Sequence, residues 1–77
     1  KASANEVTAI VFAPEGRRII AGDERGVVRI FDNGLQVRQL SGHKAAVEHI
    51  RFNHEGTFMA TGSKDFSIRL WNMRRLN

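Results

Sequence analysis

The chain has 77 residues, a formal net charge of +4 and no cysteine. A chain of this length can form one small domain with a thin core, and no disulfide framework can compensate for it. There is neither an apolar stretch long enough to cross a membrane nor a signal-peptide layout, so we expect no membrane partner. A location inside the cell, in the cytoplasm or alternatively in the nucleus, is the default interpretation.

The predicted elements begin with a strand over residues 7–13. It ends at Ala13-Pro14-Glu15-Gly16, where Pro14 presets φ and Gly16 is free to take a positive φ. Three further apolar runs follow, over residues 17–22, 27–31 and 35–40. Asn33-Gly34 is the strongest hairpin signal in the chain. Polar residues alternate with apolar ones in the last run, which is typical of an outer edge strand exposed to water.

The stretch from Val7 to Asp32 then returns without a gap as Val47 to Asn72, 40 residues further on. Seven positions are identical, and at many of the others apolar residues align with apolar ones and turn residues with turn residues. The repeat predicts strands over residues 47–52, 57–62 and 67–71, with residues 73–77 beginning an eighth. A strand-filled period of about 40–45 residues indicates a propeller blade.

We therefore predict an all-β fold made of two four-stranded antiparallel meander blades, the second lacking most of its outer strand. The predicted boundaries are an incoming loop over residues 1–6, a first blade over 7–40 and a second over 41–77.

The inner strands are apolar on both faces, so each sheet needs a layer on both sides. Two blades bury one shared interface and leave two outer faces bare. We expect further propeller blades to cover those faces, in the same chain or in another one. Since the chain opens on Lys1 rather than Met, it is interpreted as an internal piece or a processed product. If it is complete, it should form a homo-oligomer, with three copies giving six blades or four giving eight.

The second repeat resembles a blade of the WD-repeat β-propeller family. The residues that carry the resemblance are Gly42-His43, Val47-x-x-Ile50-x-Phe52, Ala60-Thr61-Gly62-Ser63-x-Asp65 and Ile68-x-Leu70-Trp71-Asn72. Asn72 stands where the family most often has Asp. In this family the His, a Ser or Thr of the second strand, the turn Asp and the Trp often form a hydrogen-bonded tetrad. The resemblance therefore implies a structural cluster of His43, Thr61 or Ser63, Asp65 and Trp71.

The first repeat departs from this pattern. Its matching positions hold Ala2, Ser3, Ala21 or Asp23, Arg25 and Phe31. We therefore expect no tetrad there, and a less rigid blade held by packing and turn chemistry. Asp23 and Glu24 are interpreted as solvated carboxylates of a turn.

Nothing in the sequence predicts catalysis, a metal site or a cofactor, so we do not expect an enzyme, and any activity would lie in other domains. His49 and His54 have no Cys or His partner at a spacing that metal sites use. Gly22-x-x-x-Gly26 lacks the Lys-Ser/Thr ending of a phosphate-binding loop.

The resemblance implies instead that other proteins or peptides dock on a face made of loops. In this chain the loops are Ser41–Ala46, Asp23–Gly26 and Ser63–Phe66, with Glu24, Arg25, Lys44 and Lys64 as candidate contact residues. The favoured function is a non-catalytic protein-interaction platform or scaffold. One alternative is a unit that oligomerises into a closed propeller.

The other alternative is a propeller of a nucleic-acid-associated (RNA or ribonucleoprotein) assembly. Two features argue against direct contact with nucleic acid. Basic residues are interspersed with acidic ones from Glu6 to Asp65, and the five Phe and one Trp fall mostly in expected strand-core positions rather than on an exposed stacking surface.

Overall fold

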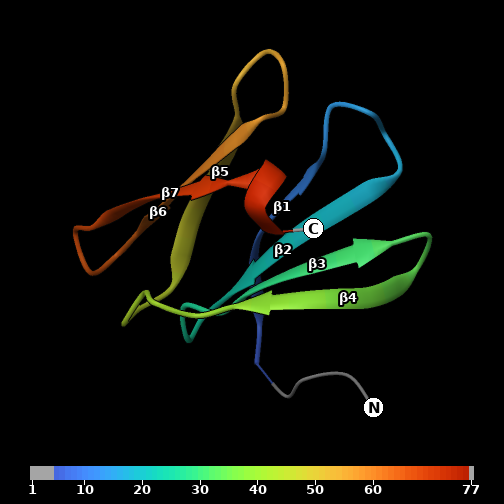
Figure 1. The fold of residues 1–77 in the computed structure, drawn as a ribbon. Helices are drawn as coiled ribbons and strands as arrows, with labels where there is room; N and C mark the ends of the chain where they lie inside the picture. Colours follow the sequence, from blue (N-terminus) through green and yellow to red (C-terminus); the bar gives the residue numbers. More distant parts are fainter. Residues whose placement is uncertain (1–4, 77) are drawn as a thin grey trace.

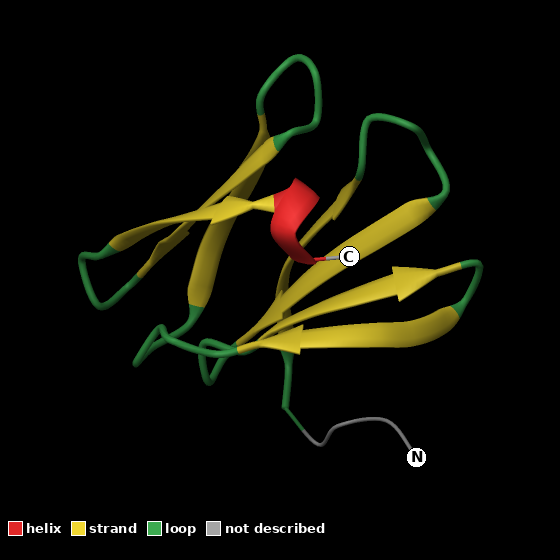
Figure 2. Cartoon of the chain, in the orientation of Figure 1, coloured by secondary structure: helices red, strands yellow, loops and turns green. Residues whose placement is uncertain are grey.

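The computed structural model describes residues 5–76, without the side chain of Leu76, and consists of two antiparallel sheets (Figures 1 and 2). The first sheet, called blade 1 below, contains β1 (Val7–Phe12), β2 (Arg18–Asp23), β3 (Val28–Asp32) and β4 (Leu35–Leu40) in that order. The second sheet contains β5 (Val47–Phe52), β6 (Phe58–Ser63) and β7 (Ile68–Asn72), and with the helix after it is called blade 2. The predicted fold class, two meander blades with a truncated second outer edge, is confirmed.

The turns that separate the strands use the residues predicted for them. Asn33 and Gly34 have φ values of 54° and 86°, as the two-residue hairpin turn requires. Gly16 and Gly56 also have positive φ, at 83° and 74°. Each of these two glycines donates its amide to the carbonyl three residues earlier, at 2.8 and 3.0 Å. The turn chemistry thus repeats with the sequence.

The predicted start of an eighth strand is wrong for residues 73–76, which form the 3-10 helix η1 (Met73–Leu76); Asn77 lies outside the described residues. The Asn72 side chain accepts a hydrogen bond from the Arg74 amide at 3.1 Å, which caps the helix. The Met73 amide donates to the Thr57 carbonyl at 2.9 Å, and the Met73 side chain is buried in the core. The cap and this burial turn the chain inward instead of extending it.

The hydrophobic core lies between the two sheets. Its buried residues are Ala13, Ile20, Val28, Ile30 and Leu40 from blade 1, and Val47, Ile50, Met59 and Met73 from blade 2. The Thr8 hydroxyl donates to the Val47 carbonyl across the interface at 2.7 Å. Gly22 allows β2 to approach β5 closely, because a Cβ at Gly22 would lie 2.6 Å from the Val47 Cβ.

The faces that point away from the core expose large apolar side chains. On blade 1 these include Ile10 and Phe12, and on blade 2 Ile68 and Leu70, each between 64 and 81% exposed. Each blade therefore has one covered face and one bare face. Strand β4 is exposed along most of its length, as predicted for an outer edge.

The expectation that the aromatic residues are mostly in the core is wrong for three of the five Phe residues. Phe12 is 64%, Phe58 39% and Phe66 100% exposed. Phe12 lies on the bare face of blade 1, and Phe66 follows Asp65 in the turn between β6 and β7. Within the described part of the chain, no helix has the length and apolar character needed to cross a bilayer.

Candidate functional site

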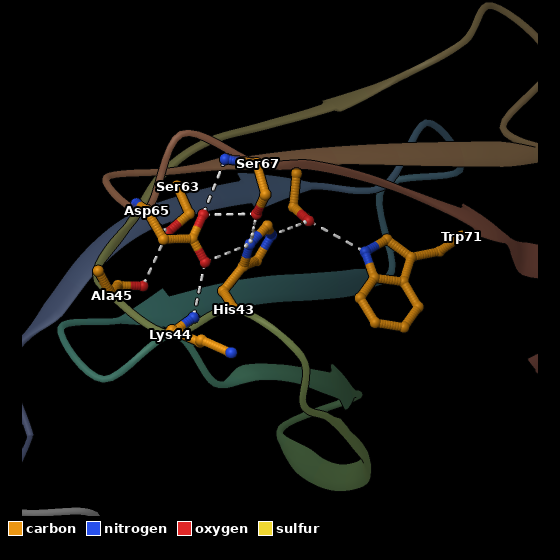
Figure 3. Close-up of polar contacts among 8 residues, drawn as sticks. His43, Lys44, Ala45, Ser63, Asp65, Ser67 and Trp71 are labelled. Carbon is orange, nitrogen blue, oxygen red and sulfur yellow. Dashed lines mark hydrogen bonds and ion pairs between the residues drawn. The ribbon is translucent and has the colours of Figure 1, made fainter.

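A polar cluster ties the loop before β5 to strands β6 and β7 (Figure 3). Its centre is Thr61, which is 1% exposed in the middle of β6. The Thr61 hydroxyl oxygen accepts a hydrogen bond from Nε1 of Trp71 at 3.0 Å and lies 2.7 Å from Nε2 of His43. Of the two hydroxyls left open by the sequence, Thr61 is therefore the one that joins the imidazole to the indole.

Ser67 links the other side of the imidazole to Asp65. Nδ1 of His43 lies 3.0 Å from the Ser67 hydroxyl, and that hydroxyl donates to the Asp65 carboxylate. The direct distance from Nδ1 of His43 to Oδ2 of Asp65 is 3.7 Å, beyond hydrogen-bond range. Sequence reasoning missed Ser67. The available signal was a hydroxyl two residues after a turn Asp, a spacing at which side chain and backbone commonly bond.

The hydrogen bonds assign one proton of the His43 ring. Ser67 has one hydroxyl proton and gives it to Asp65, so Nδ1 of His43 is the donor toward Ser67. The Thr61 oxygen accepts the Trp71 N–H, and its own proton and second lone pair allow it either to donate to Nε2 of His43 or to accept from it. Both ring nitrogens are therefore engaged, with a proton assigned to Nδ1.

Asp65 anchors the cluster to the backbone. Its carboxylate accepts the Lys44 amide at 2.7 Å and the Ser67 amide at 2.8 Å. The Lys44 amide, followed by the Ser67 hydroxyl, holds the pKa of Asp65 well below its ordinary range, although partial burial acts in the opposite direction. Ser63 is not part of the link to His43. It donates to the Ala45 carbonyl at 2.9 Å and accepts the Asp65 amide at 3.1 Å, so it holds the turn.

Blade 1 has a different polar centre, at Asp23. The interpretation of Asp23 as a solvated carboxylate is wrong, because the residue is only 2% exposed. One carboxylate oxygen accepts the Arg25 and Val27 amides at 2.9 and 3.0 Å. The other forms an ion pair with Nη1 of Arg29 at 2.8 Å. Glu24 is exposed, as expected.

This ion pair adds to the packing and turn chemistry that were expected to hold blade 1. Burial raises the pKa of Asp23, but the Arg29 guanidinium and the Val27 and Arg25 amides outweigh it, so the pKa lies below its ordinary value. Asp23 aligns with Ser63 and Arg29 with Arg69. In blade 2, where a serine replaces the carboxylate, the Arg69 guanidinium lies over Gly42 instead, and a Cβ there would be 2.5 Å from Nε. Of the other positions matched to the tetrad, Ala2 and Ser3 lie outside the described residues.

The three loops predicted to form one face do lie together. The Lys64 amide donates to the Ala46 carbonyl at 2.9 Å. Gly26, with φ at +89°, sits against the loop before β5, since a Cβ there would be 2.5 Å from the His43 carbonyl oxygen. The four candidate contact residues, Glu24, Arg25, Lys44 and Lys64, are all exposed. A hollow of about 470 Å³ opens beside this face and is lined by Glu6, Val7, Thr8, Ala46, Val47, Glu48, His49 and Lys64.

The chemistry of the cluster is that of a satisfied hydrogen-bond network. In the described part of the chain, every buried side-chain nitrogen and oxygen has a partner. Among the same residues, no three His, Asp or Glu side chains are grouped so that they could hold a metal ion. His49 and His54 are exposed.

The fold and the cluster together define the class of protein. The family model described as "WD domain, G-beta repeat" matches residues 1–32 and 34–72. The chain therefore belongs to the WD40 repeat family, and its two sheets are blades of a β-propeller. The C-terminal WD40 domain of Sif2 superimposes with a TM-score of 0.86 at 26% identity, over 100% of this chain and 22% of that one. The β-propeller domain of Myceliophteria thermophila Cps50 (Swd1) gives 0.87 at 20% identity, over 95% and 23%.

Sequence relatives come from several organisms. Pre-mRNA-processing factor 19 homolog 2 of Arabidopsis thaliana is 37% identical over 73 residues, which is 92% of this chain and 14% of that protein. U3 small nucleolar RNA-associated protein 15 homolog of Xenopus tropicalis is 36% identical over 64 residues, 80% of this chain and 12% of that protein. The chain thus matches a small part of each relative.

Proposed function

We propose that the chain is a non-catalytic part of a protein-interaction platform, and that its partners are proteins or peptides that contact the loops 23–26, 41–46 and 63–66. One observation carries the proposal: the carboxylates of Asp23 and Asp65 accept hydrogen bonds from amides in these loops or directly next to them. Asp65 accepts the amides of Lys44 and Ser67, and Asp23 accepts those of Arg25 and Val27.

Such anchoring favours binding because loops already fixed in one conformation lose little entropy when a partner arrives. The exposed side chains on the proposed face carry both signs of charge, with Glu24 beside Arg25 and Lys44 near Lys64. We infer a partner surface that also carries both signs, since charge complementarity sets specificity and association rate.

The same contacts support a non-catalytic role. Both ring nitrogens of His43 are engaged, by Thr61 and Ser67, and Asp65 is held by backbone amides. A general base needs a free lone pair within reach of a substrate proton. We propose that His43, Thr61, Ser63, Asp65 and Trp71 are structural, and that they fix strand order and turn shape in blade 2.

A role in an RNA-associated assembly is the second candidate, favoured by the names of the two relatives above. Those names also support a location inside the cell, with the nucleus as one candidate. Direct contact with nucleic acid has less support, because three arginines are paired with carboxylates. The pairs are Arg17–Asp32 at 2.9 Å, Arg18–Glu15 at 2.7 Å and Arg29–Asp23 at 2.8 Å.

The test compares two variants of the tagged chain in affinity purification from cell extract. One carries Glu24→Ala, Arg25→Ala, Lys44→Ala and Lys64→Ala on the loop face. The control carries Arg17→Ala, His54→Ala, Glu55→Ala and Arg74→Ala, which lie at the other end of the strands, the first three in turns and Arg74 in helix η1. The proposal expects the loop-face variant to lose proteins that the control retains, with nuclease treatment making no difference. Equal retention by both variants would contradict it, and loss on nuclease treatment would favour the second candidate.

A further inference from the structure

Ser41 stands where strand β4 passes into the loop before β5. It is exposed and lies three residues after Arg38, which is exposed too. Arginine at this distance before a serine is a charge pattern that arginine-directed protein kinases select in their substrates. No other serine or threonine of the chain follows an arginine at this distance. Ser67 follows Lys64 in the same way, but its hydroxyl is already engaged in the polar cluster.

The backbone around Ser41 is presented at the edge of a sheet. β4 is the outermost strand of blade 1 (Figure 1). An edge strand is extended and leaves one row of its amide and carbonyl groups unpaired. Arg38 and Gln39 are exposed, while Leu40, at 7% exposure, holds the strand against the core. A kinase can therefore bind residues 38–41 in extended form without unfolding the blade.

Arg69 lies where a phosphate on Ser41 would need a cation. Its guanidinium is over Gly42, the residue after Ser41, because a Cβ at Gly42 would be 2.6 Å from Cζ of Arg69. Arg69 is in register with Thr61, which is buried between the two blades. Residues opposite each other on neighbouring strands share a face, so Arg69 is on the side toward blade 1. Its place beside Ser41 is thus set within the chain and does not depend on where the chain begins or ends.

The internal repeat shows what Arg69 lacks. The equivalent arginine of blade 1, Arg29, is paired with the Asp23 carboxylate at 2.8 Å. Ser63 replaces that aspartate in blade 2, and among the described residues no carboxylate forms an ion pair with Arg69. A phosphoserine carries roughly 1.5 to 2 negative charges at pH 7 and three acceptor oxygens. Arginine binds such a group through two parallel hydrogen bonds.

We propose that Ser41 is a phosphorylation site for an arginine-directed protein kinase, that Arg38 is the residue by which the kinase selects it, and that Arg69 binds the resulting phosphate. In the transfer, Oγ of Ser41 bonds to the γ-phosphorus of ATP, the bond from that phosphorus to the β–γ bridging oxygen breaks, and ADP leaves. The hydroxyl proton passes to the catalytic aspartate of the kinase. The phosphate then ties the loop before β5 to strand β7.

The first experiment treats the whole chain with ATP, Mg²⁺ and activated calcium/calmodulin-dependent protein kinase II, an arginine-directed enzyme. Mass spectrometry locates the added phosphoryl group, and near-UV circular dichroism of Trp71 shows that the same sample is folded. The expected result is one phosphoryl group, on Ser41. Arg38→Ala should slow the reaction by about ten-fold or more, because a charged hydrogen bond to the kinase is lost. The control Arg75→Ala, an exposed arginine outside the pattern, should keep the original rate.

Three results overturn the assignment of Ser41. They are a folded chain that gains no phosphoryl group on this residue, equal rates for Arg38→Ala and the original chain, and phosphorylation only in a chain that has lost its Trp71 signal. If Arg38→Ala does not fold, Arg38→Gln takes its place under the same criteria.

The role of Arg69 is tested on the phosphorylated chain by phosphorus NMR as a function of pH. The second pKa of a phosphoserine is ordinarily about 6. A guanidinium beside the phosphate favours its dianion, so this pKa should be lower in the original chain than in Arg69→Gln, which keeps Ser41 and Arg38. Equal pKa values in the two folded chains would overturn the pairing with Arg69.

Discussion

Thr61 serves two aromatic rings through one oxygen atom. It accepts the indole N–H of Trp71 and contacts Nε2 of His43 while it is almost fully buried. An indole N–H or an imidazole nitrogen that is buried without a hydrogen-bond partner loses its hydration without compensation. A substitution that removes the Thr61 hydroxyl therefore also leaves the Trp71 N–H and Nε2 of His43 without their partner.

Thr61→Val should destabilise the chain by about 1–3 kcal/mol, because the Trp71 N–H and Nε2 of His43 then lack a partner. Thr61→Ser keeps the hydroxyl and should cost less than the valine variant. Urea denaturation followed by Trp71 fluorescence measures both. The role given to the hydroxyl would be wrong if the valine variant were as stable as the serine variant.

Asp23 and Glu24 are neighbours in sequence with different roles. Asp23→Ala removes the hydrogen-bond acceptor of the Arg29 guanidinium and of two turn amides, so it should lower the free energy of unfolding by about 1–3 kcal/mol. Glu24→Ala changes an exposed side chain and should stay within about 0.5 kcal/mol of the original chain. Chemical denaturation of both variants checks this, and equal losses would show that Asp23 is not the polar centre of blade 1.

The low pKa values of Asp65 and Asp23 predict loss of stability in acid. A carboxyl group whose pKa is lower folded than unfolded stabilises the fold at a pH above its unfolded value, about 3.9, and this contribution is lost as the pH falls toward the folded value. Unfolding midpoints should therefore be constant near neutral pH and fall below about pH 4. Asp65→Asn should be less stable at neutral pH and lose less on acidification. A parallel pH profile for this variant and the original chain would contradict the assignment.

At the scale of the strands, Gly22 and Gly62 form a matched pair in β2 and β6. Gly22→Ala places a Cβ against Val47 and should cost about 1–3 kcal/mol. Gly62→Ala meets open space and should be neutral or stabilising by about 0.5–1 kcal/mol, because alanine restricts the unfolded chain. The comparison is made by urea denaturation followed by Trp71 fluorescence. Similar losses at both positions would mean that close approach of the blades does not explain Gly22.

At the scale of the whole molecule, the repeat was enough to predict both blades. Gly16, Gly34 and Gly56 provide the turns, and period-two alternation provides the strands, which differ from the predictions by about one residue at their ends. The end of the chain was mispredicted because helix η1 depends on a cap from Asn72 and on burial of Met73, and neither can be read from a strand-like sequence.

The polar clusters were predictable only where the family motif names the residue. His43, Thr61, Asp65 and Trp71 belong to that motif; Thr61 joins His43 to Trp71 directly, whereas Asp65 reaches His43 through Ser67. Ser67 and Asp23 act through contacts between neighbouring strands or across a turn. Serine and aspartate are equally common in solvated turns, so the residue types alone do not predict these contacts. Their partners, His43 for Ser67 and Arg29 for Asp23, are brought beside them only by the three-dimensional arrangement of each blade.

The most direct test of a loop face held by the Asp23 and Asp65 carboxylates is amide hydrogen exchange of the whole chain, followed by NMR. The amides of Lys44 and Ser67 donate hydrogen bonds to the Asp65 carboxylate, and those of Arg25 and Val27 donate to the Asp23 carboxylate. We predict that all four are protected, although they lie in loops and turns where amides usually exchange freely. Asp65→Ala removes both acceptor oxygens, so it should release the first pair and leave the second protected. Free exchange of all four amides in a chain that keeps its Trp71 near-UV signal would contradict a fixed loop face.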